Sequence, residues 1–185
     1  MKVIETELPG VRLLESSVHR DSRGYFEEVF RHQNLTLFGD GRQFVQDNHS
    51  RSQKNVLRGL HYQEPHVQGK LVRVLAGSLQ DVVVDVRRGS PNFGQWCSFD
   101  LVAGDGKTLW IPEGFAHGIL ALEDNTDIFY KVTDYWSPEG EHTIRWDDPD
   151  INIKWQSDTP LLNDNDARAP YLRDIAELPE YSTSK

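Results

Sequence analysis

The stretch that decides the fold reads NVLRGLHYQ over residues 55–63 and QGKLVRV over residues 68–74. Both segments have the Val, Leu and aromatic content of short strands, and a turn that contains Pro65 and Gly69 joins the two strands. We therefore predict consecutive β-strands. They bring a base, His61, close to the positive charges of Arg58 and Lys70.

Side-chain alternation in the first of these strands predicts what faces the interior. Leu57, His61 and Gln63 share one face of a regular strand, and Arg58 lies on the other. A β-bulge at Gly59 would change this, and glycine inside a strand often marks a bulge. With the bulge, Arg58 and His61 both face a concave interior in which a small ligand can bind.

The strongest strand signals follow at residues 70–76 and 79–86, which are rich in Val and Leu. The segment Ala76-Gly77-Ser78 is predicted to join them as a hairpin. Asp81 and Asp85 alternate with Val82, Val84 and Val86. We therefore expect the valines on the buried face of a sheet and the two carboxylates on its other face.

Short apolar runs separated by Gly, Pro, Asn and Asp predict further strands along the chain. They cover residues 11–15, 25–30, 44–50, 95–102, 107–111, 116–121, 127–135 and 142–146. Helical periodicity is almost absent, apart from short helices expected at residues 33–38 and 173–178. The pattern predicts an all-β antiparallel sandwich or barrel with short peripheral helices, and a jelly roll is the first choice. We expect one domain over residues 1–185, with a C-terminal extension from about residue 151.

Composition excludes several classes of function. The net charge of -9 argues against a nucleic-acid surface, because such surfaces neutralise phosphates with Lys and Arg. A single cysteine, Cys97, forbids an intramolecular disulfide, and the N-terminus lacks the layout of a signal peptide. No apolar run approaches the roughly 18 residues that indicate a membrane span. The expected location is the cytoplasm.

Of the seven histidines, His61 and His117 lie in apolar, strand-like contexts. The segment IPEGFAHG, which ends at Gly118, matches the second half of the cupin signature. The first half needs two histidines separated by one residue, and here Gln63 follows His61 at that spacing. A three- or four-ligand metal site is therefore poorly supplied, and we predict no catalytic metal.

Without a metal, the chemistry open to a buried histidine is proton transfer, because its ordinary pKa of about 6.5 lies near neutrality. A core histidine satisfied by its neighbours is the competing interpretation. Lys70 and Tyr130 favour chemistry, because a lysine can hold an enolate oxygen and a tyrosine can supply a proton. For Tyr130 taken alone, a structural role is favoured, because aromatic residues dominate cores.

Several separate motifs point to one family. They are DSRGYFEE from Asp21, QDNHSRS from Gln46, VLRGLHYQ from Val56, QGKLV from Gln68, PEGFAHG from Pro112, YKVTDYWSP from Tyr130 and IRWDDPD from Ile144. Together, over residues 21–166, the chain resembles the dTDP-4-dehydrorhamnose 3,5-epimerases. The resemblance implies a cupin-type jelly roll that forms a homodimer and acts on a dTDP-4-keto-6-deoxyhexose without a cofactor.

The resemblance also implies four catalytic roles. His61 would be the base that removes protons next to the keto group, and Asp166 would be its carboxylate partner. Lys70 would stabilise the enolate oxygen, and Tyr130 would donate a proton from the opposite face. The segment around Asp166 departs from the family pattern at Asn163 and Asn165, so Asp164 remains a rival partner.

The remaining matches concern substrate binding. Family positions around the nucleotide sugar correspond to Arg23, Gln46, Asn48, Arg58 and His117. Phe26 and Glu28 match positions that reach the neighbouring subunit's site. Trp136 stands where the family usually has a tyrosine stacked on thymine. From spacing alone, Arg23 and Glu28 also fit a solvated pair, and Gln46 and Asn48 fit an exposed sheet face.

Three other functions stay open. An epimerase that inverts only C3 or only C5 would use the same catalytic residues. A non-catalytic nucleotide-sugar-binding cupin could dispense with His61, Lys70 and Tyr130, so the presence of all three favours an enzyme. A metal-dependent cupin oxygenase is disfavoured by the missing ligands.

Overall fold

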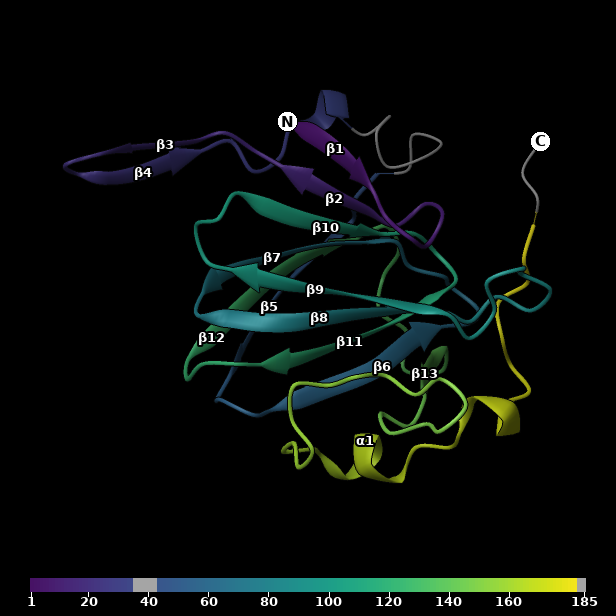
Figure 1. Ribbon diagram of the computed structural model, residues 1–185. Coiled ribbons are helices and arrows are strands. Elements are labelled where there is room, and N and C mark those ends of the chain that lie inside the picture. The colour runs from purple at the N-terminus through teal and green to yellow at the C-terminus, as the bar shows by residue number, and fades with distance from the viewer. Residues whose placement is uncertain (35–42, 183–185) are drawn as a thin grey trace.

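The computed structural model describes residues 1–34 and 43–182 and shows a chain built almost entirely of strands (Figure 1). The strands are β1 (Lys2–Glu5), β2 (Arg12–Glu15), β3 (Val18–Asp21), β4 (Gly24–Glu27), β5 (Gln46–Ser52), β6 (Leu57–Gln63), β7 (Lys70–Ala76), β8 (Ser78–Asp85), β9 (Trp96–Val102), β10 (Lys107–Ile111), β11 (Phe115–Ala121), β12 (Thr126–Val132) and β13 (Glu141–Thr143). Helices are short: α1 (Asp164–Arg168) and the 3-10 turn η2 (Leu172–Asp174). The predicted helix at 33–38 lies mostly outside the described residues.

Two antiparallel sheets pack face to face. One has the order β1-β2-β10-β7-β12-β5 and the other β13-β6-β11-β8-β9, while β3 and β4 form a separate hairpin. Val72 and Ile128 of the first sheet share one buried cluster with Val83 and Ile119 of the second. This burial of apolar surface between the sheets holds the sandwich together.

The predicted hairpin at residues 76–78 is wrong. β7 pairs with β10 and β12, whereas β8 pairs with β9 and β11, so the turn at Gly77 carries the chain from one sheet to the other. Gly77 has φ +73, and a Cβ there would lie 2.5 Å from Thr126 Oγ1. β6 and β7 likewise belong to opposite sheets, which sets His61 and Lys70 on facing layers.

The expected solvent face of β8 is also wrong, because every residue of this strand is buried. Val82, Val84 and Val86 pack beneath the C-terminal part of the chain, against Ile151 and Leu172 among others. Asp81 and Asp85 are fully buried: Asp81 lies within hydrogen-bond distance of the His117 ring, and Asp85 forms an ion pair with Arg87. The alternation of residues in β8 predicted one buried face. It contains no information on the C-terminal part of the chain, which covers the second face.

The predicted β-bulge at Gly59 is confirmed. Opposite β11, the register shifts so that three steps along β6, from Arg58 to His61, match two steps along β11. Gly59 has φ +130, and a Cβ at this position would lie 2.5 Å from the Gly118 Cα. Only glycine fits there, and the extra residue turns His61 toward the interior while Leu60 packs in the opposite core.

The β3–β4 hairpin projects away from the two sheets (Figure 1). Its base is fixed by Glu27, which forms a buried ion pair with Arg73 of β7. Within the part of the chain that the structure describes, no helix has the length and apolar character needed to cross a membrane.

Candidate active site

A pocket opens between the two sheets where β5, β6, β7 and β12 meet. It is lined by Gln46, Asn48, His61, Tyr62, Gln63, Gln68, Lys70, Tyr130, Trp136 and Glu141. Five of these residues, Gln46, Asn48, Lys70, Tyr130 and Trp136, were predicted as site residues along with His61. Polar side chains from both layers therefore surround one small cavity, as expected for a polar ligand.

Strand pairing explains how these side chains meet. Tyr130 of β12 is opposite Asn48 of β5, so the phenol and the amide lie side by side on the same sheet. Lys70 begins β7 and is opposite Val132 of β12. His61 comes from β6 in the facing sheet. The base and the two candidate donors thus approach the cavity from different layers.

His61 is paired with Asp166, which lies 105 residues further along the chain. Its Nε2 is 2.7 Å from the Asp166 Oδ1, and this carboxylate is 1% exposed. Asn163 caps helix α1 by accepting a hydrogen bond from the Asp166 backbone N–H at 2.7 Å. The other oxygen of Asp166 accepts a hydrogen bond from the Gly59 N–H at 3.4 Å. Helix α1 and the bulge at Gly59 therefore both fix the position of the Asp166 carboxylate.

The rival carboxylate does not face His61. The Asp164 side chain is 89% exposed and lies 3.5 Å from the Arg168 guanidinium. Two residues on a helix are separated by about 200°, so Asp164 and Asp166 point in nearly opposite directions.

The pairing with Asp166 determines which nitrogen of His61 can act as a base. An ionised carboxylate only accepts hydrogen bonds, so the Nε2 bonded to it carries the proton. The lone pair of Nδ1 is then left for a proton from a ligand. The same arrangement of carboxylate and imidazole fixes the tautomer in hydrolase triads.

Lys70 supplies a cation whose charge is weakly solvated. Burial lowers the pKa of Lys70 to about 8, and the negative charges of Glu141 and Asp81 partly oppose this decrease. Its Nζ donates a hydrogen bond to the His61 backbone oxygen at 3.3 Å. At neutral pH the side chain is still an ammonium ion that can stabilise an oxyanion.

The pKa of Tyr130 is shifted in the opposite direction from that of Lys70. Burial raises the pKa of Tyr130, and the negative charge of Glu141 raises it further, while Arg58 acts weakly the other way. The phenol therefore keeps its proton and can act as an acid.

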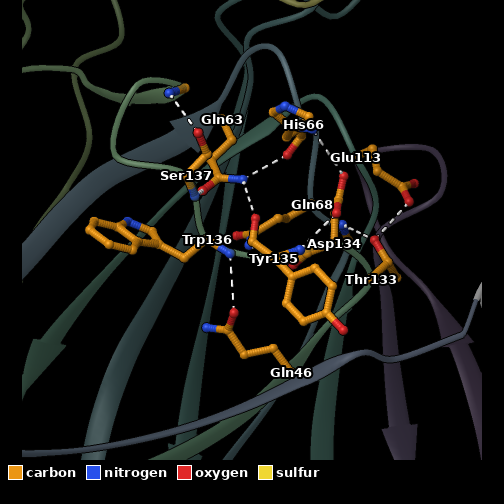
Figure 2. Close-up of polar contacts among 12 residues, drawn as sticks. Gln46, Gln63, His66, Gln68, Glu113, Thr133, Asp134, Tyr135, Trp136 and Ser137 are labelled. Carbon is orange, nitrogen blue, oxygen red and sulfur yellow. Dashed lines mark hydrogen bonds and ion pairs between the residues drawn. The ribbon is translucent and has the colours of Figure 1, made fainter.

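Trp136 lies at the mouth of the pocket and is 54% exposed. Its backbone N–H donates to the Gln46 Oε1 at 3.1 Å (Figure 2). Gln46 in turn donates to the Asn48 Oδ1 at 2.8 Å. The indole Nε1 donates to the Glu141 Oε2 at 3.2 Å. An exposed aromatic ring with a fixed backbone is suited to stacking on a planar group.

Two predicted residues lie next to the pocket lining. The Arg58 guanidinium donates to the Ser52 Oγ at 3.0 Å and to the Arg51 backbone oxygen at 3.3 Å. His117 is opposite His61 across β6 and β11, and its Nε2 is 2.8 Å from the buried Asp81 Oδ1. The second oxygen of Asp81 has no hydrogen-bond partner within the described residues.

Three predicted residues are not brought to this pocket by the single chain. Arg23 is at the tip of the projecting hairpin, where its side chain is 88% exposed and paired with Asp21. Phe26 is 70% exposed on β4, and Glu28 pairs with Arg31. All three lie on or directly after the hairpin that leaves the sandwich (Figure 1).

Four residues that line the pocket were not predicted as site residues from the sequence: Tyr62, Gln63, Gln68 and Glu141. Glu141 follows a Pro-Glu-Gly turn and begins a short strand opposite Gln63. The sequence predicts a strand from residue 142, directly after Glu141. That prediction does not indicate the direction of the Glu141 side chain. Among the described residues, no group of three or more His, Cys, Asp or Glu side chains is placed to hold a metal ion.

Comparison with known proteins identifies the family. A family model described as dTDP-4-dehydrorhamnose 3,5-epimerase matches residues 5–174. The chain belongs to this epimerase family. Relatives with the family's name are 50% identical in Shigella flexneri, over 90% of this chain and 93% of that one, and 46% identical in Pseudomonas aeruginosa, over 97% and 100%. A Neisseria gonorrhoeae relative is 51% identical over 90% of this chain, which spans 51% of that longer protein.

Solved structures of epimerases have the same fold. A 3,5-epimerase from Legionella pneumophila, in complex with dTDP-4-keto-L-rhamnose, has a TM-score of 0.94 at 45% identity and covers 98% of both chains. A 3′-monoepimerase from Streptomyces bikiniensis, in complex with dTDP-quinovose, has a TM-score of 0.89 at 35% identity, over 95% of this chain and 92% of that one. The predicted epimerase family, cupin-type jelly roll and isomerase class are confirmed.

Proposed function

We propose that this epimerase inverts C3 and C5 of dTDP-4-keto-6-deoxyglucose and yields dTDP-4-keto-L-rhamnose. The observation that carries the proposal is the pair that His61 forms with the buried Asp166, which faces Lys70 and Tyr130 across one cavity. The 3,5-epimerases compared above are 45% to 51% identical to this chain, which favours two inverted centres over the single centre of the 35% identical monoepimerase.

The keto group makes this chemistry possible without an oxidant. A ketone at C4 acidifies the C–H bonds at C3 and C5. His61 Nδ1 takes one of these protons, and the electron pair of the broken C–H bond forms the C3–C4 or C4–C5 double bond of an enolate. The ammonium of Lys70 stabilises the charge on the C4 oxygen, an effect on the order of 3 kcal/mol for one placed donor.

Inversion requires a proton from the opposite face. Tyr130 delivers it to the carbon, and the enolate returns to the ketone. His61 releases to solvent the proton that it took, and the phenolate takes one from solvent, so both groups return to their starting states. A well-placed acid or base contributes about 10²- to 10⁴-fold to the rate. Repetition at the second carbon gives the doubly inverted product with no net oxidation, so the reaction requires no redox cofactor.

The remaining predicted residues are proposed to bind the nucleotide sugar. Arg58 and His117 would contact the diphosphate or sugar, since a guanidinium fork matches pairs of phosphate oxygens. Gln46 and Asn48 would hydrogen-bond polar groups of the ligand, and Trp136 would stack on the thymine. The exposed indole and the amides at the pocket mouth support these roles.

We further propose a homodimer in which the β3–β4 hairpin reaches the partner's pocket. Phe26 is 70% exposed and Tyr25 is 49% exposed on this projecting hairpin, so these rings gain burial only from another molecule. Arg23, Phe26 and Glu28 would then complete the neighbouring site rather than their own. The proposed location is the cytoplasm, where the single thiol of Cys97 stays reduced.

The decisive experiment follows solvent deuterium into the substrate. Incubation of dTDP-4-keto-6-deoxyglucose with the enzyme in D₂O should label both C3 and C5, as read by NMR, with inverted configuration at each. Label and inversion at one carbon alone would show a single-centre epimerase. Binding of dTDP without any exchange would show a binding protein and overturn the proposal.

A further inference from the structure

The segment of residues 133–137 follows β12 and carries Trp136. It is held by hydrogen bonds to β5, to β6 and to the loop that precedes β7 (Figure 2). The Gln68 side chain donates to the Asp134 backbone oxygen at 2.8 Å, and the Thr133 hydroxyl accepts from the Gly69 N–H at 2.8 Å. The Gln46 amide oxygen accepts from the Trp136 N–H. The segment's conformation is therefore imposed from outside.

Gln63 of β6 makes the most telling of these contacts. Its amide nitrogen donates to the Tyr135 backbone oxygen at 3.2 Å, and its amide oxygen accepts from the Ser137 N–H at 2.8 Å. These two groups belong to the peptide bonds immediately before and after Trp136. One side chain thus holds the backbone on both sides of the exposed indole.

Gln63 has no hydrogen left to donate to a ligand. Its amide nitrogen also donates to the His66 backbone oxygen at 2.7 Å, so both of its N–H groups are used, and the residue is 6% exposed. Although Gln63 borders the pocket, its polar groups are directed at the segment rather than at the cavity.

We propose that Gln63 is a positioning residue, which fixes Trp136 in the orientation that receives the aromatic base of the nucleotide sugar. The inference rests on the proposed function. A ring held in place before binding does not lose conformational freedom when the base stacks on it, so pre-organisation increases affinity. The ligand is the nucleoside diphosphate part of the proposed substrate. Its base is the planar group on which the indole can stack.

The chain contains a matched control in Gln80 of β8. Gln80 is 3% exposed, and its amide nitrogen donates to the Ser98 Oγ and to the Lys154 backbone oxygen. Its amide oxygen accepts from the Gln156 N–H at 2.8 Å. It therefore makes the same number of contacts, but it holds a segment that does not line the pocket.

The test compares Gln63→Met with Gln80→Met in the full chain. Calorimetry gives the Kd for dTDP, steady-state kinetics separates KM from kcat, and hydrogen exchange reports on the Ser137 amide. Gln63→Met should weaken dTDP binding and raise KM on the order of tenfold, with kcat within about threefold. Exchange at Ser137 should accelerate. Gln80→Met should leave Kd and KM unchanged, although it too loses buried hydrogen bonds.

Trp136→Ala and the double variant with Gln63→Met show whether Gln63 acts through the indole. If it does, the double variant binds dTDP no more weakly than Trp136→Ala alone. Additive losses, equal losses in Gln63→Met and Gln80→Met, or unchanged affinity in folded Gln63→Met would overturn the inference. If Gln63→Met does not fold, Gln63→Glu takes its place, since it keeps the acceptor for Ser137 and loses both donors. Failure of the proposed function is distinct, because wild-type protein would then exchange no substrate protons.

Discussion

His61 Nε2 lies 2.7 Å from Asp166 Oδ1, although 105 residues separate the two in sequence. The carboxylate is buried and the imidazole borders the pocket, so Asp166 reaches the ligand only through His61. This contact gives His61 a defined tautomer. It also distinguishes Asp166 from Asp164, which does not contact the base.

The first prediction concerns the two carboxylates of helix α1. Asp166→Asn should reduce kcat by about 10²- to 10⁴-fold, because an amide can stabilise the wrong tautomer of His61 and does not balance its charge. Asp164→Asn is the matched control, and its kcat should equal that of the wild type because the side chain is 89% exposed. A larger loss in Asp164→Asn than in Asp166→Asn would reverse the assignment.

His61→Ala should abolish both exchange of the substrate's C5 proton with solvent and epimerisation. The imidazole is the base proposed for both carbons, and alanine leaves none in its place. Calorimetry with dTDP should show affinity close to wild type, because the diphosphate and base contacts remain. Exchange at a near-normal rate in this variant would contradict the role of His61.

Tyr130→Phe should separate exchange from inversion. His61 and Lys70 remain, so the C5 proton is still removed and the enolate is still stabilised. Delivery from the opposite face fails, and turnover to inverted product falls by about 10²- to 10⁴-fold. Deuterium should therefore enter C5 with retained configuration, as measured by NMR. Simultaneous loss of exchange and inversion in a folded variant would rule out the opposed-face role, and Tyr135 would be the next acid to test.

Lys70→Met should reduce activity without reducing the free energy of unfolding. Loss of the enolate donor should reduce kcat by about 10²- to 10³-fold. The free energy of unfolding at pH 7, from denaturant titration, should not fall, because methionine removes a poorly solvated charge. The exposed Lys154→Met is the control, with neither quantity changed. A strongly destabilised Lys70→Met would show that the ammonium is mainly structural.

The pKa of Lys70 also predicts a pH dependence. Lys70 loses its proton as the pH rises through about 8, so kcat/KM should decline there, and Lys70→Met should lack this limb. The ordinary value is 10.5, so between about 8 and 10.5 the unfolded chain binds more protons than the folded one. The contribution of this group to stability therefore rises with pH across that window.

The family, the all-β class and the strand that carries His61 could all be predicted from the amino-acid sequence. These depend on short-range patterns: alternating side chains, turn residues, and a glycine in β6 whose neighbours leave no room for a Cβ. The ordered motifs also placed Gln46, Asn48, Lys70 and Tyr130 in one site, and the structure brings these four side chains to the same pocket.

Which residues face one another depends on how distant segments pack, and local patterns did not show it. β6 and β7 follow each other in sequence but lie in opposite sheets, and both faces of β8 are buried because the C-terminal part of the chain covers one of them. The choice of Asp166 over Asp164 required the orientation of helix α1, and the contacts of Gln63 required a segment more than 70 residues away. Local patterns specify the period of a strand, whereas burial and hydrogen-bond partners depend on packing between distant segments.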